Sequence, residues 1–338
     1  MKISQLEIER FRGIKRCKLV FPDHVVLIGD NNTGKSTVFE AIDLALGPDR
    51  LNRRSVIDEH DFYRGEYLQV DGEEPRQIKV EVIITRLNDE QRFRFMDYIE
   101  WWDESKKELH TVPPVEAVDG VSIEPALRVT FLGFYDPEED DFSTNTYFSR
   151  SLTESDTPQL FKKKDKQFCG FLYLRSLRTG SRALSLEHGS LLDIILRLKE
   201  IRPQMWEKTI NEVGAFNVAS DPALGISGVL ESIEAAITKY VPREWGVTPH
   251  LKVSNLTREH LRKVVTAFIA TGESEHAAPF YRQGTGTINM LVLAMLSQIA
   301  EDKQNVIFAM EEPETAIPPY AQKRIIHEVR NLSVQSLF

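Results

Sequence analysis

Two short stretches near opposite ends of the sequence contain the residue types that bind and cleave nucleotides. The first, "GDNNTGKS", spans residues 29–36 and fits the pattern G-x-x-x-x-G-K-[ST]. In this pattern, backbone N–H groups and a helix N-terminus surround the phosphates, while the lysine and the hydroxyl bind phosphate and Mg²⁺. It predicts an ATP site made of Gly29, Asn31, Asn32, Gly34, Lys35, Ser36 and Thr37.

The second stretch, "VIFAMEEPE" at residues 306–314, is an apolar run followed by acids. In P-loop enzymes an acid at the end of a buried strand holds the Mg²⁺ shell, and a second carboxylate orients the attacking water. We therefore expect Glu311 and Ser36 to hold the metal, and Glu312 to act as catalytic base beside the catalytic Lys35. Most P-loop enzymes have aspartate where this chain has Glu311. Glu314 is expected either to bridge to a partner subunit or to be exposed.

A glycine turn precedes an apolar helical pattern in "YRQGTGTINMLVLAML", at residues 281–296. A helix N-terminus offers unpaired N–H groups to an anion, so this turn is a second candidate phosphate site. We expect Gly284, Thr285 and Gly286 of one subunit to close over the ATP held by the other. The alternative is an ordinary helix start.

The elements that position these residues follow from hydrophobic periodicity. Strands are expected at 3–9, 17–21, 77–87 and 127–135, with a weaker one at 144–152. A buried strand at 24–29 leads into the phosphate loop, and a helix at 35–46 follows it and ends at Gly47-Pro48. Residues 103–120 and the charge runs 136–141 and 161–166 are expected to be loops.

The second half of the sequence alternates strands and helices around a helical segment. Strands are expected at 168–178, 250–256, 263–271 and 305–311, and helices at 288–302 and 321–332. We therefore predict an α/β fold in which residues 1–186 and 241–338 form one ATPase domain. Residues 187–240 form a helical insertion that serves in dimerisation.

Composition limits the remaining possibilities. The 338 residues carry a net charge of −9, so DNA contact requires local basic clusters. The sequence has only two cysteines and no secretory leader, which predicts a cytoplasmic protein. It has no apolar run of about 20 residues, so no membrane span is expected. The cluster "DEHDFYR" at 58–64 is expected to be a loop, not a metal site. The basic candidates are Arg50, Arg53, Arg54, Lys162 to Lys166, Arg175, Arg178 and Arg182.

Taken together, four motifs of this sequence resemble the ABC-type ATPase heads of the RecF/SMC class. The motifs are "FRGIKRCKLVF", "GDNNTGKST", "RQGTGTINMLVLAML" and "FAMEEPETAIPP". They resemble most closely the ATPase domain of OLD-family (overcoming lysogenization defect) nucleases. The resemblance implies an antiparallel β subdomain, Walker A and B motifs on adjacent strands, and Gly284-Thr285-Gly286 as a signature loop with glycine at the usual serine position. It also implies that Arg12 approaches the nucleotide. Gln69 and Gln77 are candidates for the glutamine that binds Mg²⁺.

The resemblance also implies partners. OLD proteins continue into a Toprim nuclease domain with a D-x-D carboxylate set, and no D-x-D occurs in these 338 residues. We expect the final "LSVQSLF" to begin a strand that leads to a switch histidine, and the nuclease to be supplied in cis or in trans. The predicted function is an ATPase that gates a DNA nuclease, in phage defence or DNA processing, as a homodimer or higher even oligomer. The alternative is a RecF/SMC-like repair ATPase that dimerises on DNA. A transporter ATPase is disfavoured by the poor signature loop.

Overall fold

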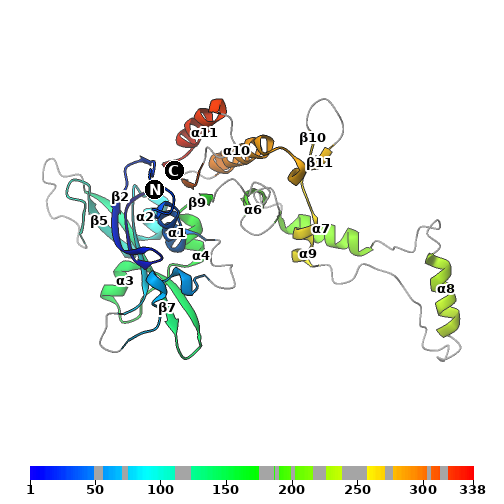
Figure 1. Ribbon diagram of the computed structural model, residues 1–338, viewed down its shortest axis with the longest axis horizontal. Helices are drawn as coiled ribbons and strands as arrows, with labels where there is room; N and C mark the ends of the chain where they lie inside the picture. Colours follow the sequence, from blue (N-terminus) through cyan, green and yellow to red (C-terminus); the bar gives the residue numbers. More distant parts are fainter. Residues whose placement is uncertain are drawn as a thin grey trace. The chain divides into compact units, whose positions relative to one another are not determined.

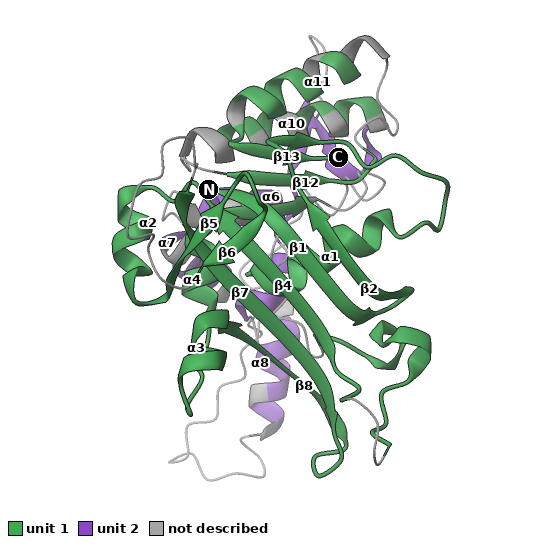
Figure 2. Ribbon diagram, turned by 90° about the vertical axis from the view of Figure 1, so that its left-hand side faces the viewer, with its two compact units in different colours: residues 1–180, 284–338 green, residues 181–283 purple. Residues whose placement is uncertain are grey.

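The computed structural model divides the chain into two compact units. Unit 1 comprises Met1–Gly180 and Gly284–Phe338, and unit 2 comprises Ser181–Gln283 (Figures 1 and 2). The predicted helical segment 187–240 falls within unit 2. The residues that the structure describes are 1–48, 56–70, 75–110, 123–174, 186, 190–198, 202–215, 226–237, 257–270, 277–302, 306–312 and 319–338.

Unit 1 contains an antiparallel sheet of seven strands, which confirms the predicted antiparallel subdomain. Six strands run in the order β2-β1-β4-β7-β5-β6, and β8 also pairs with β7 (Figure 2). Lys2 to Leu6 of β1 are all buried, and an alternation of buried and partly buried residues follows only over Leu6 to Glu9. The strands are β1 (Lys2–Phe11), β2 (Ile14–Val20), β4 (Ile78–Thr85), β5 (Ile99–Asp103), β6 (Glu108–His110), β7 (Ile123–Asp136) and β8 (Asp141–Phe148).

The second sheet of unit 1 is parallel and has the order β3-β13-β12-β9. Its strands are β3 (His24–Val25), β13 (Gln335–Leu337), β12 (Ile307–Met310) and β9 (Phe171–Leu174). The expected strand within 332–338 is therefore present. However, β13 lies between β3 and β12, so the prediction that the two nucleotide motifs occupy adjacent strands is wrong.

A buried amide explains how β13 is held in that position. The Gln335 side chain is fully buried, and its Oε1 accepts from the Ile3 N–H at 2.8 Å. Its Nε2 donates to the carbonyls of Ile3 and Pro22, both at 2.9 Å. These bonds connect β13 to β1 and to the chain just before β3, so the Gln335 side chain links the parallel sheet to the antiparallel sheet. They bring Gln335, near the end of the chain, next to Ile3 near its start.

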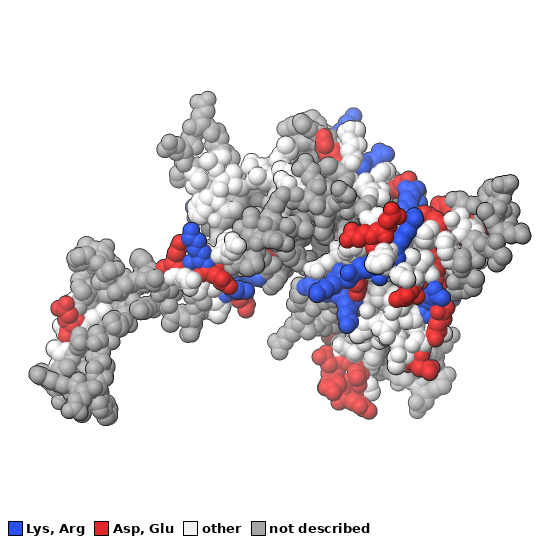
Figure 3. All heavy atoms as spheres, turned by 180° about the vertical axis from the view of Figure 1, so that it is seen from behind, with Lys and Arg blue, Asp and Glu red and all other residues white. Residues whose placement is uncertain are grey.

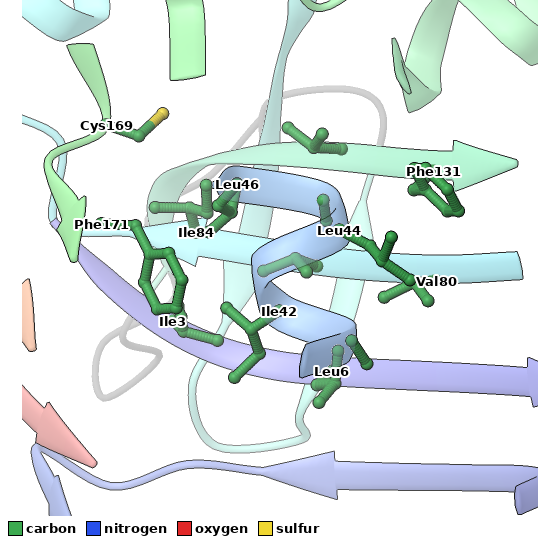
Figure 4. Packing of buried hydrophobic residues seen from close by; sticks show 14 of the residues in the cluster. Ile3, Leu6, Ile42, Leu44, Leu46, Val80, Ile84, Phe131, Cys169 and Phe171 are labelled. Atoms are coloured by element: carbon green, nitrogen blue, oxygen red, sulfur yellow. The ribbon is translucent and has the colours of Figure 1, made fainter. Parts of the chain in front are cut away.

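Helix α1 (Lys35–Leu46) packs in the core between the two sheets. Its apolar residues recur at helical spacing, so a broad face is available for burial. Ile42, Leu44 and Leu46 lie among side chains of β1, β4 and β7, with Phe171 of β9 close by (Figure 4). The helix begins and ends as predicted, with Gly34 and Gly47 as its caps. Because the core fixes α1, it also fixes the loop that precedes its N-terminus.

The strand before that loop differs from its prediction. Residues 24–29 were expected to form a buried strand, but only His24–Val25 are strand, and the backbone pairing continues to Leu27. Val26 is 64% exposed and Ile28 is 92% exposed. Within the described residues β3 is an edge strand with one neighbour, β13.

Several short elements complete the first part of unit 1. They are the 3₁₀ helices η2 (Glu59–Asp61), η3 (Tyr63–Gly65) and η4 (Met96–Tyr98), and the α-helices α2 (Asp89–Arg94), α3 (Ser149–Glu154) and α4 (Lys163–Phe168). The loop expected at 103–120 contains β6, which pairs with β5. The charge run 161–166 is largely helix α4 rather than a solvated loop. Its Lys166 is buried and donates to the Leu44 carbonyl at 2.8 Å, near the C-terminus of α1, where a cation is favourable.

The last part of unit 1 supplies two helices, α10 (Thr285–Asp302) and α11 (Pro319–Leu332), which pack against each other. Unit 2 has a small core of Leu186, Trp206 and Leu261. The elements of unit 2 are α6 (Leu191–Leu198), α7 (Arg202–Ala215), α8 (Ile226–Ile237), α9 (Arg258–Val264), β10 (Phe268–Ala270), β11 (Ala277–Pro279) and η9 (Phe280–Arg282).

Two strands and the absence of a membrane span, all predicted from the sequence, can be compared with the structure. The strand expected at 250–256 lies outside the described residues. The strand expected at 263–271 is shorter, since α9 extends to Val264 and the strand begins at Phe268. Among the helices that are described, none has the length and apolar character needed to cross a bilayer.

Candidate functional site

The loop of residues 29–34 is exposed and tightly turned ahead of α1. Gly34 has φ +94°, and Asn32 also has a left-handed φ of 66°. A β-carbon at Gly29 would lie 2.9 Å from Thr33 Oγ1, so a larger residue there would displace the Thr33 side chain. Thr33 Oγ1 donates to the Asp30 carbonyl at 2.9 Å and closes the turn. Of the two glycines in the predicted pattern, Gly34 is the one whose backbone conformation favours glycine.

Lys35 lies across this loop. Its Nζ donates to the carbonyls of Gly29 and Asp30, at 2.6 and 2.8 Å. No side chain among the described residues caps the N-terminus of α1, and its first turn holds no acid. The N-terminus therefore keeps its partial positive charge for an external anion. Ser36 is exposed in that first turn, and Thr37 is partly buried.

The acidic end of the site follows β12. Glu311 is partly buried, and its Oε1 accepts a hydrogen bond from the hydroxyl of Tyr173 on β9 at 2.9 Å. Glu312 is exposed and has a left-handed φ of 46°. Such a conformation costs about 1 kcal/mol or more for a residue with a β-carbon, and it recurs at functional sites. Glu314 lies outside the described residues.

The parallel sheet brings the loop and the acids to the same edge. Parallel strands present their carboxyl ends together, and this edge is where α/β proteins bind ligands. Neighbouring strands lie about 4.8 Å apart, so β3 and β12, with β13 between them, are separated by roughly 10 Å. The residues present fit a magnesium nucleotide, because a helix N-terminus without a side-chain cap and Lys35 follow β3, and Glu311 follows the parallel strand β12. Carboxylate and hydroxyl oxygens are ligands that Mg²⁺ accepts.

Arg12 lies in the turn between β1 and β2 and bridges two carboxylates. Its Nε donates to Asp61 Oδ1 at 2.8 Å, and its Nη2 donates to Glu40 Oε2 of α1 at 2.7 Å. Its backbone N–H also donates to the Asp61 carbonyl. Burial opposes the charge, but the hydrogen bonds of Asp61 and Glu40 outweigh it and raise the Arg12 pKa. Arg12 thus connects the first hairpin, the 58–64 segment and the helix that begins at Lys35.

Helix α10 starts three residues before the predicted position 288 and so includes part of the glycine turn. The Gly284 carbonyl accepts the first helical hydrogen bond, from the Ile288 N–H at 3.2 Å. A β-carbon at Gly284 or Gly286 would meet nothing within 4 Å, so neither glycine is required by packing in this chain alone. The helix itself begins at Thr285. The contact with a second subunit's ATP stays a prediction.

The candidate DNA contacts are only partly described. Arg50, Arg53, Arg54, Arg175, Arg178 and Arg182 lie outside the described residues. Lys166 is buried and is therefore removed from the candidates, whereas Lys162 and Lys164 are exposed. Basic and acidic side chains are interspersed on the face in Figure 3. Among the described residues, no group of three His, Cys, Asp or Glu side chains is placed to hold a metal ion.

Comparison with known protein families finds a match for the first half of the chain. A family model described as an AAA ATPase domain matches residues 1–172 of the 338, just over half of the chain. The chain belongs to this family. The match includes the phosphate loop and α1, and it makes the protein an ATPase-domain protein. No curated protein matches the chain.

Two solved structures are similar to nearly the whole ATPase-domain chain. One is Stu0660 of Streptococcus thermophilus, with 12% identity and a TM-score of 0.42, covering 99% of this chain and 68% of that one. The other is an Smc head bound to the C-winged helix domain of ScpA, with 12% identity and a TM-score of 0.47, covering 99% of this chain and 88% of that one. Similarity at this level says nothing about activity or partners.

Sequence reasoning missed two residues of the site. Tyr173 contacts Glu311, and Glu40 holds Arg12. The tyrosine had a signal, since its hydroxyl stands within the apolar run "FLYL" and a buried hydroxyl needs a partner. Glu40 gave none, because an acid on a helix surface is ordinary.

Proposed function

We propose that this ATPase domain binds ATP with Mg²⁺ and hydrolyses it at the edge of the parallel sheet. The proposal rests on one observation. The phosphate loop, with Lys35 folded onto its carbonyls, follows β3, and Glu311 and Glu312 follow the carboxyl end of β12 in the same parallel sheet. A site for a polyanion and a set of oxygen ligands thus meet at one edge.

In the proposed mechanism each residue has a separate task. Backbone N–H groups of the 29–34 loop and of the α1 N-terminus bind the phosphates. Lys35 exchanges its two carbonyl partners for phosphate oxygens, since a charged acceptor is stronger than a neutral one. Ser36 and Glu311 would hold Mg²⁺, directly or through water, and the ion would neutralise charge on the phosphates. Glu312 orients the attacking water and accepts its proton.

The test is ATP binding and hydrolysis by the purified chain with Mg²⁺. Lys35→Ala should lower ATP affinity at least about tenfold, because a charge-assisted contact is lost. Glu312→Gln should keep affinity and lower kcat about 10²- to 10³-fold, the usual effect of a general base. Lys18→Ala and Glu328→Gln change exposed residues of the same types and serve as matched controls.

Two results would refute these assignments. Unchanged ATP affinity of Lys35→Ala would remove the phosphate-loop role. Hydrolysis by Glu312→Gln at the parent rate would show that another group acts as base.

We further propose that two copies close on ATP, with Gly284-Thr285-Gly286 completing the partner's site, and that the ATP state controls a Toprim nuclease of the OLD type. The resemblance of the "EEPE" segment and its prolines to that family supports the nuclease. The alternative is a RecF/SMC-like ATPase in which ATP only drives dimerisation on DNA. Isolation of the native protein separates them, because only the first predicts a metal-dependent nuclease activity that co-purifies with the ATPase.

A further inference from the structure

Tyr173 of β9 contacts a residue from each half of the candidate nucleotide site. Its hydroxyl donates to Glu311 Oε1 at 2.9 Å. Its ring lies 6.1 Å, centroid to centroid, from the ring of Phe39 on α1, at an interplanar angle of 46°. One side chain therefore contacts both the acidic strand end and the helix of the phosphate loop.

The strand register explains the first contact. β9 runs parallel to β12, with Tyr173 paired to Ala309. Glu311 stands two residues beyond Ala309, so its side chain lies on the same side of the sheet as that of Tyr173. The tyrosine is long enough to reach forward to the carboxylate, and its hydroxyl satisfies the need of a partly buried phenol for a partner.

The helix periodicity explains the second contact. Phe39 is buried, and it follows Ser36 by three residues and Lys35 by four. Residues at these spacings share one face of a helix. Contact with Phe39 therefore connects Tyr173 to the turn of α1 that begins the phosphate site, and holds its ring in place.

We propose that Tyr173 is a positioning residue that orients the Glu311 carboxylate for the metal of the nucleotide complex. The hydrogen bond holds one carboxylate oxygen, so the rotation of the group is restricted before the metal arrives. Partners that orient a ligating carboxylate typically change metal affinity 10- to 100-fold when they are removed. This inference rests on the proposed function, since it assumes that Glu311 serves Mg²⁺.

A purely structural role for Tyr173 makes a different prediction. If only its ring packing matters, Tyr173→Phe should leave every property unchanged, because phenylalanine keeps the ring and the Phe39 contact. If the hydroxyl matters for the metal, the effect should be confined to Mg²⁺ and should depend on Glu311.

The experiment measures ATP affinity by calorimetry, first in EDTA and then across a Mg²⁺ titration. For Tyr173→Phe we expect affinity in EDTA within about twofold of the parent, and the Mg²⁺ concentration at half-effect raised about tenfold. Adding Tyr173→Phe to Glu311→Gln should produce no further shift, because the two changes remove one function. Tyr135→Phe is the matched control, since it removes a hydroxyl that donates to Asp140 on the hairpin of β7 and β8.

The outcomes are distinguishable. A Mg²⁺ dependence of Tyr173→Phe within twofold of the parent overturns the positioning role. So does an equal loss of affinity in EDTA and in Mg²⁺, which would indicate general damage to the site. The metal role in the proposed function is refuted if the parent shows no Mg²⁺-dependent gain in ATP affinity, or if Glu311→Gln keeps that gain. Either result also refutes the Tyr173 proposal, which depends on that role.

Discussion

At the scale of single residues, Arg12 shows how a charged side chain is used as a structural link. Its side chain is one-third exposed, but Glu40 and Asp61 expose only 12% and 8% of theirs. A guanidinium presents several donors in a fixed plane, so it satisfies two carboxylates from different elements at once. Removing it would leave two largely buried acids without this partner.

We therefore predict that Arg12→Ala lowers the free energy of unfolding by about 3 kcal/mol, as expected when one partner of a buried ion pair is removed. Arg12→Lys should recover only part of this loss, because an ammonium lacks the planar fork. Urea unfolding followed by circular dichroism measures the change. Arg16→Ala, at a side chain that is 72% exposed, should stay within about 0.5 kcal/mol of the parent. An Arg12→Ala stability equal to that of Arg16→Ala would disprove the link.

At the scale of elements, the pairing of β3 with β13 positions the phosphate loop. His24 of β3 and Ser336 of β13 share a hydrogen bond of 2.8 Å between Nδ1 and Oγ. Burial lowers the His24 pKa, the charge of Arg330 lowers it further, and Asp23 opposes both. The folded pairing therefore favours neutral His24 more than the unfolded chain does.

The sign of the pH dependence follows from this shift. His24 contributes its full stability above the ordinary histidine pKa of about 6.5, and the contribution is lost as pH falls through the lowered folded pKa. We predict that the free energy of unfolding falls between about pH 7 and 5 more steeply in the parent than in His24→Gln. Arg330→Gln should also flatten the curve, because it removes a charge that opposes protonation. Parallel curves for parent and His24→Gln would contradict the assignment.

At the scale of the whole molecule, the two units differ in how much apolar surface they enclose. Unit 1 has one large core around α1, whereas the described core of unit 2 is small. On α8 the side chains of Val229 and Ile233 are 60% and 43% exposed, and their spacing puts them on one helix face. An exposed apolar face of this kind supports our proposal that the helical segment mediates dimerisation.

We predict that the parent sediments as a dimer or higher even oligomer, and that Val229→Glu with Ile233→Glu shifts it toward the monomer of 38.7 kDa. A buried charge opposes association unless it is paired. Sedimentation velocity with and without ATP measures this. Glu231→Lys, a charge change at an exposed position of the same helix, is the control. Dimers of the double variant at the parent's affinity would place the interface elsewhere.

Local patterns in the sequence were enough to predict the phosphate loop, the bounds of α1 and the strands β1, β4 and β7. Each depends on neighbours within a few residues: glycines that permit a left-handed turn, apolar spacing of 3.6 or 2, and a cap. The same rules predicted that Glu311 and Glu312 follow a buried strand. The family to which residues 1–172 belong agrees with the ATPase character inferred from the loop.

Only the tertiary structure decided which of these pieces are neighbours. β13 separates β3 from β12 because Gln335 bonds to the backbone of residues more than 300 positions away. Lys166 looked like part of a solvated charge run, but the end of α1 provides its carbonyl partner and allows its burial. Tyr173 meets Glu311, and Arg12 meets Glu40, for the same reason. Sequence periodicity specifies which side of an element is buried, whereas partner choice depends on packing between segments that are distant in the chain.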